Sequence, residues 1–261
     1  MTSCFHCAHV PPYKPLCAAL FEKKFQSSWL RRELLTYLSS ISPNSSSSSS
    51  SSSPNSSFVQ EVTKGVYSFP FLTNEASGMI LKEVQHYMKY CGEHDLPIHR
   101  PNSMNNYGIV MRQMGLHELI LDLQVNYLHP TSAELFPLHS NGGFSSHHSF
   151  IVSYSTDKDT HLDMHTDDSD VTFNICLGNE GFTASGLTFC GIRGQSNHRK
   201  FSCSYQHHIG HAVVHLGEQR HGADVITSGE RHNLIIWNKN EAYRQTEVYR
   251  CSIFILLLQI I

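Results

Sequence analysis

The chain has no dense cluster of basic side chains and no apolar run long enough to cross a bilayer. Its 19 Lys and Arg nearly balance its 22 Asp and Glu, so the net charge is −3 with histidine neutral. Because nucleic acids are bound through clustered basic side chains, this balance argues against a nucleic-acid partner. The apolar tail at residues 251–261 is too short for a transmembrane segment. The tail either packs on the domain or is a terminus that promotes aggregation.

The chain also lacks the features of a secreted, disulfide-linked protein. The eight cysteines are scattered, and no early apolar stretch resembles a secretory signal. We therefore predict free thiols in an intracellular, cytoplasmic protein. Cys4 and Cys7 form a Cys-x-x-Cys pair, but only Cys17 follows where a zinc site needs a second pair. We do not predict a metal site there.

Residues 1–57 differ in composition from the rest of the chain and contain an uninterrupted serine run from Ser45 to Ser53. Such a run cannot bury enough apolar surface to offset its ordering entropy, so we predict a disordered, Ser-rich leader. Within the leader, residues 28–38 have the apolar spacing of a short amphipathic helix. Acidic residues are scarce while Ser, Lys and Arg are common, which leaves an organellar targeting segment as the alternative.

The folded domain is predicted at residues 58–250. A strand is expected at 65–72, followed by a helix at 75–91. A second helix is expected at 117–136, where Pro130 breaks or kinks it.

After these helices the apolar period changes from about 3.6 residues to about 2 residues. Short strands separated by Gly-containing turns are predicted at 149–154, 171–177, 187–190, 212–216 and 234–237. Helices followed by evenly spaced strands predict an α+β domain with a small antiparallel barrel or sandwich.

Two His-x-Asp pairs stand in tandem in the strand-rich region, His161 with Asp163 and His165 with Asp167. Side chains two residues apart on an extended segment share a face, so either pair could present two metal ligands together. The second pair is followed by a polar turn and then by the strand at 171–177, which places it at the mouth of a barrel strand. We therefore favour His165 and Asp167, and interpret the first pair as a hydrogen-bonded loop pair.

A third ligand must come from a more distant segment, and five histidines are in range: His207, His208, His211, His215 and His221. His211 and His215 flank an apolar strand and fit histidines whose hydrogen bonds are satisfied at strand ends. His221 precedes Gly222, which allows backbone and substrate to approach a metal closely. Two imidazoles and one carboxylate leave coordination positions open, as in non-haem Fe(II) oxygenases.

Arg231 lies ten residues after His221, at the start of a predicted strand. A guanidinium there can bind a carboxylate with two hydrogen bonds. The alternative is a surface salt bridge with Glu230 or Asp224.

The segments 165–177, 186–189, 210–215 and 221–237 resemble the prolyl 4-hydroxylase and lysyl hydroxylase branch of the 2-oxoglutarate and Fe(II)-dependent dioxygenases. The resemblance covers roughly residues 149–240, the expected catalytic core. It implies a double-stranded β-helix (jelly-roll) core with N-terminal supporting helices.

The resemblance also assigns site residues. His165, Asp167 and His221 match the iron ligands, and Arg231 matches the residue that binds the distal carboxylate of 2-oxoglutarate. Two further cosubstrate contacts are matched by Tyr154, eleven residues before His165, and Asn174, nine residues after it, although each also fits an ordinary strand residue. One departure is Ala184-Ser185-Gly186, where the family usually has Gly-Gly, and it could alter the substrate edge.

The implied activity is that of an oxidoreductase. O2 and 2-oxoglutarate are consumed, a C–H bond is hydroxylated, succinate and CO2 are released, and ascorbate keeps the iron reduced. The resemblance suggests a peptidyl lysine or proline of a protein or peptide as the primary substrate, with specificity set by loops around 92–110 and 138–148.

Two alternatives remain. A catalytically impaired oxygenase fold could serve as a binding or regulatory protein, although the intact ligand set and Arg231 argue against it. A zinc hydrolase could use the same ligands, but it lacks a general base such as the Glu of His-Glu-x-x-His and leaves Arg231 without a task.

Overall fold

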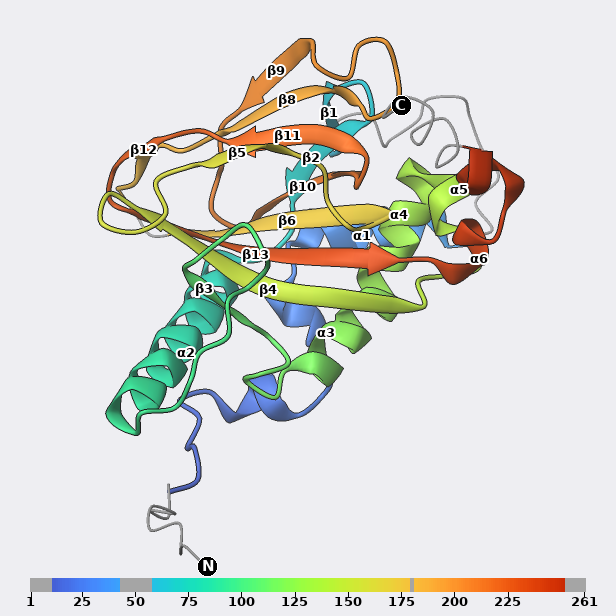
Figure 1. The fold of residues 1–261 in the computed structure, drawn as a ribbon. Helices are drawn as coiled ribbons and strands as arrows, with labels where there is room; N and C mark the ends of the chain where they lie inside the picture. Colours follow the sequence, from blue (N-terminus) through green and yellow to red (C-terminus); the bar gives the residue numbers. More distant parts are fainter. Residues whose placement is uncertain (1–10, 43–57, 179–180, 252–261) are drawn as a thin grey trace, which may run out of the picture.

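The computed structural model describes residues 11–42, 58–178 and 181–251. The Cys4–Cys7 pair, the serine run and residues 252–261 of the apolar tail lie outside the described residues. Figure 1 shows two facing β-sheets, with most of the helices on the far side of the larger one. The described cysteines are free thiols.

The larger sheet, called the major sheet, has seven strands, and all neighbouring strands are antiparallel. Their order is β1 (Gln60–Thr63), β2 (Val66–Pro70), β10 (His211–Leu216), β6 (Val171–Gly178), β13 (Glu230–Lys239), β4 (Ser146–Ser155) and β3 (Gly108–Val110). β6 is buried along its whole length because helices cover one of its faces and the second sheet covers the other. This explains its continuous apolar sequence.

The second, minor sheet has four strands in the order β5 (Leu162–His165), β11 (Gln219–Ala223), β8 (Leu187–Ile192) and β9 (Phe201–Tyr205). A separate two-stranded sheet is formed by β7 (Thr183–Ala184) and β12 (Ile226–Ser228). Two facing antiparallel sheets with helices packed outside confirm the predicted α+β class with a double-stranded β-helix core.

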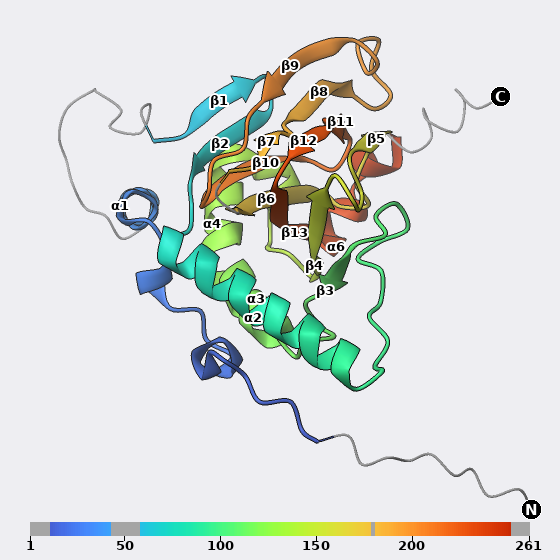
Figure 2. The same ribbon diagram turned by 90° about the vertical axis from the view of Figure 1, so that its left-hand side faces the viewer.

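Most of the helices cover the outer face of the major sheet (Figure 2). The described helices are α1 (Arg32–Ile41), α2 (Asn74–Glu93), α3 (His117–Leu123), α4 (His129–Leu135), α5 (Pro137–Ser140) and α6 (Glu241–Arg244), with short 3-10 turns η1 (Ala18–Phe21) and η2 (Ser27–Trp29). Thr73 caps α2 by accepting a hydrogen bond from the backbone N of Ala76 at 3.1 Å. No described helix combines the length and apolar character needed to cross a membrane.

The helix predicted at 117–136 is a continuous helical run with a π-helical segment, η3 (Gln124–Leu128), between α3 and α4. Pro130 follows directly, in the first turn of α4. Because proline removes one backbone donor and clashes with the preceding turn, a local change of helical hydrogen bonding before it is expected.

Residues 11–42 differ from the predicted disordered leader, because they belong to the folded domain. Leu20, Phe25, Trp29 and Leu34 are buried in the main core cluster together with residues of α2 and β6. The backbone N of Thr73 also donates to the carbonyl of Trp29 at 2.9 Å. The amphipathic helix predicted at 28–38 corresponds to α1, which carries Leu34. The rest of the segment was missed because Leu20 and Trp29 stand in short 3-10 turns, which show neither a helical nor a strand period.

Candidate metal centre

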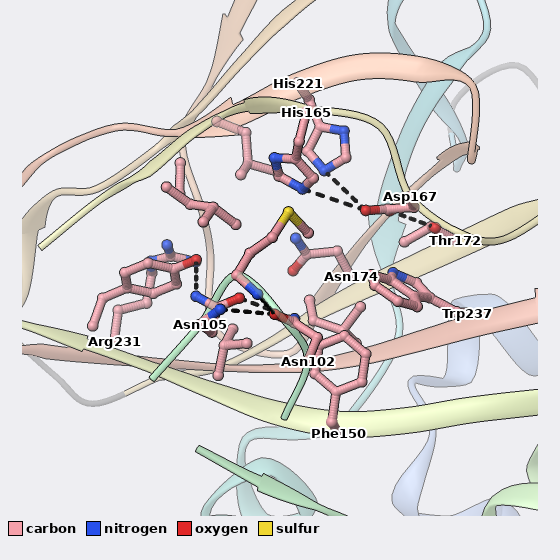
Figure 3. Close-up of a pocket in the computed structure, with 17 residues that line it drawn as sticks. Asn102, Asn105, Phe150, His165, Asp167, Thr172, Asn174, His221, Arg231 and Trp237 are labelled. Atoms are coloured by element: carbon pink, nitrogen blue, oxygen red, sulfur yellow. Dashed lines mark hydrogen bonds and ion pairs between the residues drawn. The ribbon is translucent and has the colours of Figure 1, made fainter. Parts of the chain in front are cut away.

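His165 and His221 lie on neighbouring antiparallel strands of the minor sheet. His165 ends β5 and His221 is in the middle of β11, and the two residues are direct cross-strand partners. Their ring centroids lie 4.4 Å apart. Directly opposed residues project from the same face of a sheet, and this face lines the cavity between the two sheets. Figure 3 shows both imidazoles pointing toward Asp167.

Asp167 is held rigidly just after β5. Its backbone N donates to the carbonyl of Gly217 at 2.9 Å, and its Oδ2 accepts a hydrogen bond from Thr172 Oγ1 at 2.7 Å. The other oxygen, Oδ1, lies 3.4 Å from His165 Nε2 and 3.8 Å from His221 Nε2. One carboxylate oxygen is therefore anchored, and the other faces both histidines.

The backbone fixes which nitrogen of each histidine is available. His165 Nδ1 lies 2.7 Å from the carbonyl of Asp163, and His221 Nδ1 lies 2.9 Å from the carbonyl of Gln219. Because a carbonyl can only accept, each Nδ1 carries the proton and each Nε2 keeps its lone pair. In residues 11–42, 58–178 and 181–251, these two histidines and Asp167 form the one group of His, Cys, Asp or Glu able to hold a metal ion, with ligand atoms within 4.8 Å of one another.

The electrostatics of the cluster suit a divalent cation. Burial lowers the pKa of His221 to about 3, against the opposing effect of Asp167. Burial would raise the pKa of Asp167, but His221 and His165 outweigh it and hold that pKa below its usual value. The carboxylate is therefore ionised and His221 neutral, the forms in which both groups bind metals.

Arg231 lies on the opposite sheet, near the start of β13, and its side chain is only 1% exposed. Its Nε donates to Ser185 Oγ at 2.9 Å and its Nη1 donates to Asn233 Oδ1 at 2.8 Å. Its Nη2 has no hydrogen-bond partner among the described residues. A buried cation with an unpartnered nitrogen is costly, and an anion bound beside it would remove that cost.

The surface salt bridges considered for Arg231 do not form. Glu230 instead pairs with Lys158 at 2.7 Å, and Asp224 accepts a hydrogen bond from Thr188 at 2.7 Å. Within the described part of the chain, Arg231 has no carboxylate partner.

Tyr154 and Asn174 stand on strands beside Arg231 and line the same cavity. Tyr154 is the cross-strand partner of Arg231, whose Cζ lies 4.5 Å from the centroid of the tyrosine ring. The Tyr154 hydroxyl accepts a hydrogen bond from Asn105 Nδ2 at 3.1 Å. Asn174 Oδ1 accepts a hydrogen bond from Asn233 Nδ2. The structure thus brings all six predicted site residues to one cavity between the two sheets.

The other histidines and the tandem pair have different surroundings. His161 and Asp163 have largely exposed side chains, and the 3.7 Å between His161 Nε2 and Asp163 Oδ1 is too long for a hydrogen bond. Asp163 also belongs to strand β5, so the expected hydrogen-bonded loop pair does not form. His215 is fully buried, and its Nδ1 donates to the carbonyl of Leu216. Its Nε2 has no hydrogen-bond partner in the part of the chain that the structure describes, and lies 4.0 Å from Asp167 Oδ2. His215 is therefore only half satisfied, contrary to the sequence expectation, because it packs against the metal-binding group instead of solvent.

Sequence reasoning missed several residues of the cavity. Asn102, Met104 and Asn105 line it, and they belong to the loop around 92–110 that was expected to set specificity. No residue of the loop at 138–148 lines the described cavity. Ser185 and Asn233, which hold Arg231, carried no sequence signal beyond their closeness to the Gly186 turn and to Arg231 itself.

Comparison with known proteins identifies the family of the chain. A sequence model of the OGFOD2-like domain matches residues 10–141. The chain is 36% identical over 191 residues to the 2-oxoglutarate and iron-dependent oxygenase domain-containing protein ICU11 of Arabidopsis thaliana, covering 71% of this chain and 48% of that protein. It is 34% identical over 189 residues to the 2-oxoglutarate and iron-dependent oxygenase domain-containing protein 2 of Homo sapiens, covering 72% of this chain and 53% of that protein. The chain thus spans about half the length of these curated relatives.

Among solved structures, the fold is similar to that of a prolyl hydroxylase from Trichoplax adhaerens in complex with a peptide fragment of the hypoxia inducible factor oxygen degradation domain. The TM-score is 0.50 at 14% identity, covering 71% of this chain and 88% of that one. This likeness supports the double-stranded β-helix fold. From the family match over half of its length, the chain belongs to the OGFOD2-like domain family of 2-oxoglutarate and iron-dependent oxygenases.

Proposed function

We propose that this domain is a 2-oxoglutarate- and Fe(II)-dependent dioxygenase that hydroxylates a C–H bond and releases succinate and CO2. The observation that carries the proposal is one cavity lined by both a three-residue metal-binding group and a buried guanidinium with an unpartnered nitrogen. A dicarboxylic oxo acid satisfies both, because its oxo-acid end chelates a metal while its far carboxylate pairs with a cation.

His165, Asp167 and His221 are the proposed iron ligands. The donor set fits Fe(II), since two imidazole nitrogens and one carboxylate oxygen converge from a rigid frame. Iron, when bound, supplies the O2-dependent oxidation of 2-oxoglutarate and of the substrate C–H bond. The chain contributes fixed ligand orientation through the carbonyls of Asp163 and Gln219.

Arg231, Tyr154 and Asn174 are the proposed cosubstrate contacts. Arg231 Nη2 would donate to the distal carboxylate, which removes its missing hydrogen bond. Since the Tyr154 hydroxyl accepts from Asn105, its own proton remains available to a carboxylate oxygen. Asn174 uses its Oδ1 toward Asn233, so its Nδ2 can face the cosubstrate.

About half of the side chains that line the cavity are apolar, Phe150, Val152, Leu187 and Trp237 among them. These apolar side chains exclude water, which strengthens the charged contacts and protects a reactive centre. The proposed primary substrate is a peptidyl lysine or proline, a choice supported by the resemblance to the prolyl 4-hydroxylase and lysyl hydroxylase branch. Ascorbate is the proposed reductant for the iron.

The zinc hydrolase alternative gains no support. Among the described residues that line the cavity, Asp167 is the one carboxylate, and it faces the two histidines. It is therefore committed as a ligand and cannot also serve as the general base of a hydrolase.

The test uses the full chain with Fe(II), ascorbate and 2-oxoglutarate, and measures succinate. Asp167→Ala should abolish succinate formation, whereas the matched control Asp163→Ala changes an almost fully exposed carboxylate and should leave it intact. Succinate production that survives Asp167→Ala would contradict the proposed ligand set. Wild-type protein that makes no succinate would instead favour the impaired, regulatory alternative. A lysate protein that gains the mass of one oxygen atom would identify the primary substrate.

A further inference from the structure

The turn that leads into β8 contains two consecutive L-residues in the left-handed region of backbone conformation. Ala184 has φ 60° and Ser185 has φ 59°. Side chains with a Cβ disfavour this region, which glycine adopts freely. The neighbouring Gly186 is required for a different reason, since a Cβ there would lie 2.4 Å from the carbonyl oxygen of Tyr205. The chain therefore has two residues with a strained backbone conformation at positions where glycine would be unstrained.

The two strained residues have different surroundings. The side chain of Ala184 is exposed on the edge strand β7. Ser185 is fully buried, at 0% exposure, and its Oγ accepts the hydrogen bond from Arg231 Nε at 2.9 Å. Only Ser185 therefore has a buried side-chain contact that accompanies the strain.

That contact orients Arg231 without neutralising it. Ser185 Oγ and Asn233 Oδ1 are uncharged acceptors, and they take Nε and Nη1. The guanidinium is thereby locked at two nitrogens, while its charge and its third nitrogen stay available to a ligand. An acidic residue at either place would have consumed that charge.

Resting on the proposed function of Arg231, we propose that Ser185 is a positioning residue for the cosubstrate. Its strained backbone places a hydroxyl on Arg231 Nε, so that Nη2 is aimed at the distal carboxylate of 2-oxoglutarate. Strained L-residues persist where the surrounding structure compels them, and they concentrate at functional sites. The hydrogen bond to Arg231 gives this strain a function.

The turn offers a matched pair of variants for the test. Ser185→Ala keeps the Cβ and the backbone strain, and removes only the hydroxyl. Ala184→Gly relieves the same kind of strain next door, and leaves the hydroxyl in place. Binding of 2-oxoglutarate to the full chain loaded with Mn²⁺ is measured by calorimetry, and pyruvate, which lacks the distal carboxylate, is the control ligand.

For Ser185→Ala we expect about tenfold weaker binding of 2-oxoglutarate, since a misaligned charged donor loses much of its hydrogen bond. Pyruvate binding should stay at the wild-type level. Ala184→Gly should raise the melting temperature and leave both ligands unaffected. In an Arg231→Met background, Ser185→Ala should have no further effect on 2-oxoglutarate, because the two residues act as one unit.

Three outcomes would overturn the inference. Ser185→Ala could bind 2-oxoglutarate as tightly as wild type, or could lose 2-oxoglutarate and pyruvate equally, or its effect could add to that of Arg231→Met. The first outcome would show that Ser185 does not contribute to cosubstrate binding. The second would indicate general damage to the site, and the third would show that Ser185 does not act through Arg231. A wild-type chain that binds Mn²⁺ but not 2-oxoglutarate would overturn the proposed function, and this inference with it.

Discussion

Replacing Arg231 with methionine isolates the contribution of one buried charge to cosubstrate binding. Methionine is long, unbranched and uncharged, so it fills much of the volume of the arginine without its donors. The proposed contact is a hydrogen bond between a guanidinium and a carboxylate, and such charged bonds contribute about 1.5–3 kcal/mol. At about 1.4 kcal/mol for each factor of ten, Arg231→Met should weaken 2-oxoglutarate binding by roughly 10- to 150-fold.

We expect a loss of affinity in the upper part of this range because Arg231 is buried. Its side chain is 1% exposed, so solvent does not screen the interaction as it would at a surface. Nη2 also has no hydrogen-bond partner among the described residues. Without the cosubstrate, the donor capacity of Nη2 is therefore unused, and binding gains the full hydrogen bond.

The assay is calorimetric titration of the Mn²⁺-loaded protein with 2-oxoglutarate and, separately, with pyruvate. Arg231 contacts only the distal carboxylate in the proposed complex, so pyruvate should bind wild type and variant alike. A loss of less than about threefold for 2-oxoglutarate would refute this reasoning, since it corresponds to less than about 0.7 kcal/mol. An equal loss for both ligands would show that the substitution disturbs the metal-binding group instead.

Two further predictions concern the frame of the site, and a third concerns His147, away from it. Asp167→Asn should remove most of the rise in melting temperature caused by Mn²⁺. The control Asp163→Asn changes a side chain that is 99% exposed and should show the same rise as wild type. An equal loss of this rise in both variants would argue against the ligand assignment. Gly217→Ala would place a Cβ 2.0 Å from the carbonyl oxygen of Ser169. It should therefore lower the free energy of unfolding in urea by about 1–3 kcal/mol. An unchanged unfolding midpoint would mean that the turn holding Asp167 can adjust to the added Cβ. Burial, followed by the neighbouring His117, lowers the pKa of His147 from 6.5 to about 4, so the unfolded chain binds this proton first and wild-type stability falls as pH drops below about 6.5. Between about pH 7.5 and about pH 5, the free energy of unfolding of His147→Phe should fall by up to about 2 kcal/mol less than that of wild type. Parallel curves of unfolding free energy against pH for the two proteins would contradict this expectation.

The long strands of the major sheet could be predicted because burial leaves a clear mark in the sequence. β6 is buried at every position, and the predicted range 171–177 matches it closely. By contrast, β9 is mostly exposed and β11 has no apolar run, so neither was predicted. His221 nevertheless lies on β11. Its position was predicted from its spacing to Arg231 in the sequence, because hydrophobic periodicity gave no signal there.

The environment of Arg231 could not be predicted in the same way. That a guanidinium follows His221 by ten residues is visible in the sequence, but its burial and its unpartnered Nη2 are not. The acceptor of the Arg231 Nε hydrogen bond is Ser185, whose positive φ is rare for serine and has no sequence signature. The departure from Gly-Gly at this turn is visible in the sequence, but the hydrogen bond from Arg231 to Ser185 is not.

The two halves of the cavity belong to different sheets. His165 and His221 stand on the minor sheet, whereas Tyr154 and Arg231 stand on paired strands of the major sheet. A dicarboxylate held by metal at one end and by Arg231 at the other would join the sheets much as a removable cross-link does. A ligand that contacts both sheets of the folded domain, and does not bind the unfolded chain, stabilises the packing of the two sheets by mass action.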